Sequence, residues 1–153
     1  MRHVLVVRTV NPAMLEIRTG ENSAAESISS PRRDSEAIPE PFDLVLAGLG
    51  GCTTNAIADH AISNGWHLDA IHVDLALFGE APWQAIGRRI WVDGDVDSSQ
   101  LASLLGAAEQ SPVAVALRPT VYIQSRIARV ASPTTPPGDE FKDADEDERR
   151  DMN

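Results

Sequence analysis

Strand-forming residues recur in five short stretches of the chain, with apolar side chains in alternation or in a short run. These stretches are 3–9, 13–19, 70–78, 88–94 and 120–127. The first two are separated by Asn-Pro and the next two by a turn-rich connection, so each pair predicts a β-hairpin. In 70–78 the apolar residues fall at every second position, which indicates a half-buried strand.

The segment from Pro41 to Gly65 has the pattern of a helix that is apolar around most of its circumference. Proline suits the first helical turn, and an acid at Asp43 suits the positive end of the helix dipole. Three glycines weaken a continuous helix, so we expect a short helix, a break or tight packing point, and a helix running from about Cys52. The apolar side chains should be largely buried. They are Leu44, Val45, Leu46, Leu49, Ala56 and Ile57.

Two further helical segments follow in the C-terminal half. A leucine stripe after a capping residue, Asp97 or Ser98, predicts a helix that ends near residue 110. Ser111 and Pro112 suit the N-cap and the first position of another helical turn. The order is hairpin, helix, hairpin, helix and strand. Because strands and helices are grouped rather than strictly alternating, we expect an α+β fold.

The length of 153 residues suits one domain with a buried core. We assign this domain to residues 1–131, with a polar loop at 20–40 that includes a short strand near 26–29. Residues 132–153 are rich in proline, glycine and acids, and we expect this acidic tail to be disordered. Of the net charge of −10, the segment 139–153 carries −5, with eight acids and three bases. The remaining body is mildly acidic, so nucleic-acid binding is not expected, because phosphate contacts need a basic surface.

The sequence carries no membrane signal. The longest uncharged run, 44–58, is too short to cross a bilayer, and the first residues lack the pattern of a signal peptide. The single cysteine, Cys52, excludes an internal disulfide. We therefore expect a cytoplasmic protein without a membrane partner.

Cys52 is the strongest candidate for a chemically reactive residue, and it lies in the stretch GLGGCTTNA. A free cysteine is among the most buried residue types, so it can be a small core residue. It can also be a nucleophile, because a helix N-terminus lowers the pKa of a thiol and low-pKa thiols are the ones that peroxides oxidise. The pattern alone leaves both readings open.

The stretch PFDLVLAGLGGCTTNAI resembles the OsmC/Ohr family of osmotically inducible and organic-hydroperoxide-resistance proteins. The family signature is a proline, an acid two residues on, a leucine, a run of small and apolar residues, and a cysteine that opens the central helix. Here these positions are Pro41, Asp43, Leu44, Gly51 and Cys52. Together with later segments, the likeness covers roughly residues 3–130. It implies an intertwined homodimer, in which β-hairpins pack around a long buried helix and paired sites lie at the subunit interface.

The resemblance also implies roles for individual residues. The family uses a first cysteine to attack a peroxide and a second to resolve the sulfenic acid as a disulfide. Cys52 matches the first, but Ser111 stands at the second position, in SPVAVAL, and a hydroxyl cannot form a disulfide. The usual two-cysteine cycle is therefore impossible within one subunit.

The family also places an arginine, held by an acid, near the reactive cysteine. Asp43 matches the acid. The arginine stays open among four candidates, each of which can equally be a solvated surface charge. These candidates are Arg8, Arg18, Arg32 and Arg33.

Two functions follow from this likeness. The first is a one-cysteine, thiol-dependent reductase of organic hydroperoxides, which needs an external thiol reductant. The alternative is a non-enzymatic OsmC-fold dimer that binds a small apolar ligand or senses oxidants through Cys52. No cofactor is expected. No metal is expected either, because His3, His67 and His72 lack ligand spacing, and His60 lies over two turns beyond Cys52.

Overall fold

The structure, a computed structural model, describes residues 2–21, 26–27 and 40–130. The acidic tail, most of the 20–40 loop, Arg32 and Arg33 lie outside these ranges. The predicted domain boundary near residue 131 therefore stays a prediction. A short strand does occur at 26–27, inside the predicted stretch.

The strands form one six-stranded sheet in the order β3-β2-β1-β4-β5-β6. Neighbouring strands are antiparallel, except that β5 and β6 are parallel. Both predicted hairpins, β1–β2 and β4–β5, are present. The strands are β1 (Arg2–Thr9), β2 (Met14–Glu21), β3 (Glu26–Ser27), β4 (Leu68–Phe78), β5 (Ala85–Gly94) and β6 (Tyr122–Arg129).

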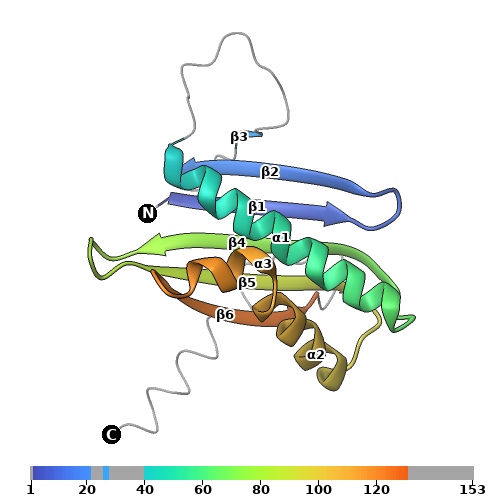
Figure 1. Cartoon of the computed structure of the whole chain (residues 1–153). Coiled ribbons are helices and arrows are strands. Elements are labelled where there is room, and N and C mark those ends of the chain that lie inside the picture. Colours follow the sequence, from blue (N-terminus) through green and yellow to red (C-terminus); the bar gives the residue numbers. More distant parts are fainter. Residues whose placement is uncertain (1, 22–25, 28–39, 131–153) are drawn as a thin grey trace, which may run out of the picture.

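Three helices lie on one face of this sheet (Figure 1). They are α1 (Pro41–Ser63), α2 (Ser98–Glu109) and α3 (Pro112–Leu117). Helix α1 runs across β1 and β4, while α2 contacts α1 and β6. Helices α2 and α3 form the crossover that a parallel pair such as β5–β6 requires. The predicted α+β class and the order of elements are confirmed.

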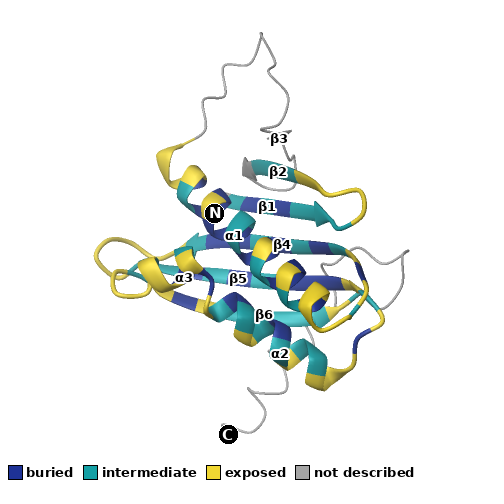
Figure 2. Ribbon diagram, turned by 45° about the vertical axis from the view of Figure 1, so that its right-hand side comes forward, coloured by how far each residue is buried: buried dark blue, intermediate teal, exposed yellow. Residues whose placement is uncertain are grey.

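The core lies between α1 and the central strands, where Figure 2 shows buried residues as dark bands. Successive side chains of a strand point to opposite faces of a sheet, and the alternate apolar residues predicted in β4 do face the helices. Their partners come from both neighbouring strands and from α1 and α2. The main buried residues are Val4, Val6, Ile71, Val73, Leu75, Ile86, Ile90, Val92, Leu46, Leu49, Ile57 and Leu104.

Helix α1 is continuous, so the predicted break at its glycines is wrong. The alternative, a tight packing point, is correct for Gly50. A Cβ atom there would overlap Val6 Cγ2 and lie 2.8 Å from Leu75 Cδ1. Glycine at this position lets the helix backbone approach β1 and β4 more closely than any other residue allows.

The ends of the helices follow the local signals in the sequence. Asp97 caps α2 in a capping box: its carboxylate accepts from Gln100 N at 2.8 Å, and Gln100 Oε1 accepts from Asp97 N at 2.8 Å. Asn64 is the C-cap residue of α1, and Gly65 follows with a φ of 70°, a conformation that favours glycine.

Replacing Gly50 by alanine should destabilise the fold, although alanine is the better helix former. The clash with Val6 and Leu75 is of the overpacking kind, which costs about 1–3 kcal/mol. The matched control is Gly106→Ala in α2, where a Cβ atom meets nothing within 4 Å. This control should gain about 1 kcal/mol from helix propensity. Urea denaturation of both variants measures the difference, and equal shifts would contradict the close contact.

Candidate functional site

Cys52 lies in the interior of α1, about three turns from either end of the helix. The prediction that it opens a helix is therefore wrong. The helix dipole acts mainly within the first and last turns, so a helix start does not activate this thiol. Any activation has to come from side chains that surround the middle of α1.

Cys52 is half-buried on the more open side of α1. Leu44, Gly48 and Asn55 lie on the same side and are exposed. Leu44, which the pattern places among the buried residues, is 56% exposed in the single chain. The surroundings of the thiol are therefore accessible and partly apolar. This does not agree with the interpretation of Cys52 as a fully buried core residue.

Asp43 is 2% exposed in the first turn of α1. Nine residues separate it from Cys52, which corresponds to about 13.5 Å along the axis and to opposite sides of the helix. Asp43, which matches the acid that holds the arginine in the family, is therefore not in contact with Cys52 within one chain.

The candidate arginines differ in their positions. Arg8 shares its face of β1 with Val4 and Val6, towards α1. Its Nη1 donates to Asn55 Oδ1, one helical turn beyond Cys52. Of the candidates in the described part of the chain, Arg8 is the one that reaches the turns around the thiol.

Arg18 is on the other side of the sheet. In β2 it pairs with Leu5 of β1, whereas the neighbouring Ile17 pairs with the buried Val6. Its Nε donates to Glu16 Oε1 at 2.7 Å, and this hydrogen bond raises the pKa of Arg18 above its usual value. Arg18 is therefore held away from Cys52.

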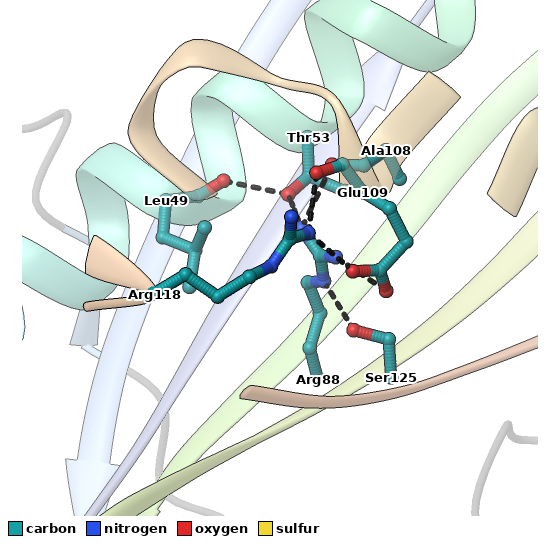
Figure 3. Close-up of polar contacts among 7 residues, drawn as sticks. All are labelled: Leu49, Thr53, Arg88, Ala108, Glu109, Arg118 and Ser125. Carbon is teal, nitrogen blue, oxygen red and sulfur yellow. Dashed lines mark hydrogen bonds and ion pairs between the residues drawn. The ribbon is translucent and has the colours of Figure 1, made fainter. Parts of the chain in front are cut away.

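The structure reveals another arginine, Arg88 of β5, that the sequence analysis missed. Its side chain is 0% exposed and lies between the sheet and the helices (Figure 3). Nε donates to Ser125 Oγ at 2.9 Å, and Nη1 donates to Thr53 Oγ1 at 2.9 Å and to the Ala108 carbonyl at 3.3 Å. Nη2 donates to Glu109 Oε1 at 3.1 Å, which completes an ion pair.

Thr53 connects this arginine to the turn that carries Cys52. Its hydroxyl accepts from Arg88 and donates to the Leu49 carbonyl at 2.7 Å. Glu109 is shared, because its Oε2 accepts from Arg118 Nη2 at 2.6 Å. The guanidinium of Arg88 thus joins α1, α2 and β6 at one buried point.

The electrostatics of Arg88 reflect its burial. Desolvation lowers the pKa of Arg88 from its usual value, and the charge of Glu109 acts against this. A smaller contribution in the same direction as Glu109 comes from the negative charge of Cys52 as a thiolate.

Ser111 lies beside the same buried point. Its backbone N donates to the Ala108 carbonyl at 3.2 Å, the carbonyl that also accepts from Arg88. Ser111 is the N-cap residue of α3 and Pro112 follows at the first position, as predicted, but the serine side chain makes no cap hydrogen bond. Its hydroxyl is buried, with the residue 1% exposed, and has no hydrogen-bond partner among the described residues.

The other candidates have structural contacts. His60 Nε2 lies 2.7 Å from Ser103 Oγ, and its ring meets that of Trp66 edge to face, so it ties α1 to α2. Within the described ranges, no group of three or more His, Cys, Asp or Glu residues is placed to hold a metal ion. None of the described helices has the length and apolar character needed to span a bilayer.

Comparison with known proteins identifies the family. The family model for the OsmC-like protein matches residues 34–126, so the chain belongs to the OsmC-like family. A search of curated proteins finds no match.

Solved structures agree on the fold. An OsmC-like protein from Mycoplasma pneumoniae has a TM-score of 0.55 at 9% identity, over 82% of this chain and 95% of that chain. An organic hydroperoxide resistance protein from Elizabethkingia anophelis has a TM-score of 0.56 at 13% identity, over 82% and 96%. A putative osmotic stress induced and detoxification response protein from Psychrobacter arcticus has a TM-score of 0.52 at 15% identity, over 74% and 88%. At these identities the likeness shows the fold alone.

Replacing Thr53 by valine should destabilise the protein, because a buried N–H group of Arg88 loses its acceptor. A buried donor left without a partner costs about 1–3 kcal/mol, and more when it is charged. Thr54→Val is the matched control, since Thr54 is equally buried but donates only to the Gly51 carbonyl, at 2.8 Å. Chemical denaturation should show the larger loss for Thr53→Val; equal losses would mean that the bond to Arg88 contributes nothing.

Proposed function

We propose that the chain is a thiol-dependent reductase of organic hydroperoxides in which Cys52 is the only peroxidatic cysteine. The observation that carries this proposal is the position of the thiol. Cys52 is accessible on α1, Arg8 reaches the next turn of the same helix, and Arg88 lies beneath the adjacent residue. Family membership supports a redox role of this kind.

In the proposed reaction the Cys52 thiolate attacks one oxygen of the peroxide. The O–O bond breaks, the sulfur is oxidised to sulfenic acid, and the alkoxide leaves and takes a proton to become an alcohol. Positive charge near the site favours both the thiolate and the departing alkoxide. Arg8 is placed for this on the open side of the helix.

The sulfenic acid is then reduced by two external thiols. The first forms a mixed disulfide with Cys52 and releases water, and the second restores Cys52 and leaves as a disulfide with the first. Ser111 cannot take the place of the first thiol, because it has no sulfur. A low-molecular-weight thiol or a lipoyl group has the required chemistry, and the reducing cytoplasm that we expect for this protein supplies such thiols.

The surface around Cys52 favours an organic peroxide over hydrogen peroxide. Leu44 and Leu15 are 56% and 46% exposed, and Leu15 Cδ2 lies 3.8 Å from the position of a Cβ atom on Gly51, the neighbour of Cys52. The alkyl group of a substrate can bury this apolar surface, which is worth about 25 cal/mol per Å².

Ser111 also supports a second function, that of a sensor or binding protein without turnover. Without a resolving thiol, oxidation of Cys52 persists until an external thiol arrives, and a persistent change suits an oxidant sensor. The same apolar surface can hold a small apolar ligand. The two functions differ in whether peroxide is consumed catalytically.

Organic hydroperoxide should convert Cys52 to a sulfenic acid that a dimedone-type trap captures as one adduct per chain, absent in Cys52→Ser. Turnover should require an added monothiol or dithiol. Ser111→Cys should form an intrachain disulfide with Cys52 and lose the adduct if the two positions face each other. A wild-type thiol that reacts with peroxide no faster than free cysteine would exclude the reductase and leave the binding function.

The homodimer implied by the family likeness is part of this proposal. Leu44 and Ile62 are exposed large apolar residues on α1, and such surface is typical of an interface. Light scattering at micromolar concentration should give the mass of two chains. Leu44→Glu should shift the equilibrium towards the monomer while circular dichroism stays unchanged. A monomeric wild-type protein would contradict the prediction.

A further inference from the structure

The environment of Arg88 raises a question that the proposed function does not answer. A buried guanidinium is costly, because a charge that leaves water loses its favourable hydration. Arg88 nevertheless occupies a core-facing position of β5, between the buried Ile86 and Ile90. An apolar residue there would suit the core better, so the charge needs a role in addition to packing.

We propose that Arg88 is a positioning residue for Cys52: through Thr53 it fixes the middle turn of α1, and it supplies buried positive charge that favours the thiolate. This inference rests on the proposed function, because it assumes that Cys52 acts as a thiolate. It concerns a different arginine from Arg8, which lies at the open side of the helix.

The first step of the argument is distance. Arg88 Nη1 lies 2.9 Å from the hydroxyl of Thr53, the residue that follows Cys52. The Cα atoms of Thr53 and Cys52 are about 3.8 Å apart, because the two residues are consecutive. The guanidinium therefore lies close to the residue that carries the thiol. Thr53 points into the core while Cys52, turned by about 100° around the helix, remains half-exposed.

The second step is the strength of the field. Helix α1 offers no N-terminus near Cys52, and the hydrogen bond of Arg8 is solvent-exposed, where water and salt screen its charge. Arg88 is fully buried, and charges interact more strongly where the effective dielectric constant is low. The interaction between the charges of Arg88 and Cys52 agrees with this placement.

The third step is the counter-charge. Glu109 partly neutralises Arg88, but the same carboxylate also binds Arg118, which is 40% exposed. Removing the charge of Glu109 without removing its hydrogen-bonding ability should therefore increase the effect of Arg88 on Cys52. Removing the charge of Arg88 should have the opposite effect. A purely structural contact predicts the same direction for both changes.

The experiment is the pH dependence of Cys52 alkylation by iodoacetamide, together with the ultraviolet absorbance of the thiolate. Because Cys52 is the only cysteine, both signals report on this site alone. In Arg88→Met the pH profile of alkylation should move to higher pH, and alkylation at neutral pH should slow by up to about tenfold. Arg88→Lys should restore part of the effect, and Glu109→Gln should move the midpoint to lower pH.

Arg89→Met is the matched control. Arg89 is the next residue of β5, but it lies on the opposite face of the sheet and pairs with Asp74. This variant should leave the alkylation profile unchanged. Equal shifts in Arg88→Met and Arg89→Met, or a shift of Glu109→Gln in the same direction as Arg88→Met, would overturn the inference.

Two further outcomes of the experiment also have a defined meaning. If Arg88→Met does not fold, Arg88→Lys and Glu109→Gln carry the test, because both keep hydrogen-bonding groups at the buried point. Lack of movement in both would overturn the inference. Peroxide consumption is measured separately: opposite shifts without any turnover would refute the reductase while confirming the role of Arg88.

Discussion

The close contact between helix α1 and the sheet at Gly50 is the constraint on which the site depends. With no side chain at this position, the helix backbone packs directly against Val6 and Leu75. Protein interiors are packed as densely as organic crystals, so the helix cannot rotate without a clash. The contact therefore decides that Thr53, three residues on, faces inwards and that Cys52 stays half-exposed.

The buried polar cluster is built on this arrangement. Arg88 lies beneath α1 and donates four hydrogen bonds. Three go to side chains of α1, α2 and β6, and one goes to a backbone carbonyl of α2. Buried ion pairs are weak evidence of stability, because apolar residues of similar volume often stabilise as well or better. The cluster is better understood as a means of fixing position, since it holds the middle of α1 against the end of α2, two residues before Ser111.

The sequence predicted the elements well and the site only in part. Alternation identified the strands because each of them has one core-facing side, as Ile71, Val73 and Leu75 show. It could not decide whether a glycine interrupts a helix or allows it to pack closely, because that depends on Val6 and Leu75, which are distant in the sequence. The helix-start prediction for Cys52 failed for the same reason.

Arg88 was missed because Arg88-Arg89 has the appearance of a solvated charge pair. A signal for its burial was present, since Ile86, Arg88, Ile90 and Val92 occupy alternate positions of one strand. A strand that begins at residue 85 instead of 88 adds Ile86 to this alternation and puts Arg88 inside the strand rather than at its first position. No local pattern could have identified its partners, and Arg8 could be selected from the other arginines only when the faces of the sheet were known.

The partners of Arg88 are distant from it in the sequence, and this has a consequence for the chain before it has folded. Thr53, Glu109 and Ser125 are 35, 21 and 37 residues from Arg88, so the cluster consists of non-local contacts, which exist only once these distant parts of the chain have come together. A nascent or unfolded chain lacks the buried guanidinium that contacts Thr53, so its thiol is without the positive charge that we propose Arg88 supplies. On the role proposed for Arg88, Cys52 therefore acquires its reactivity only when the fold closes around the buried guanidinium.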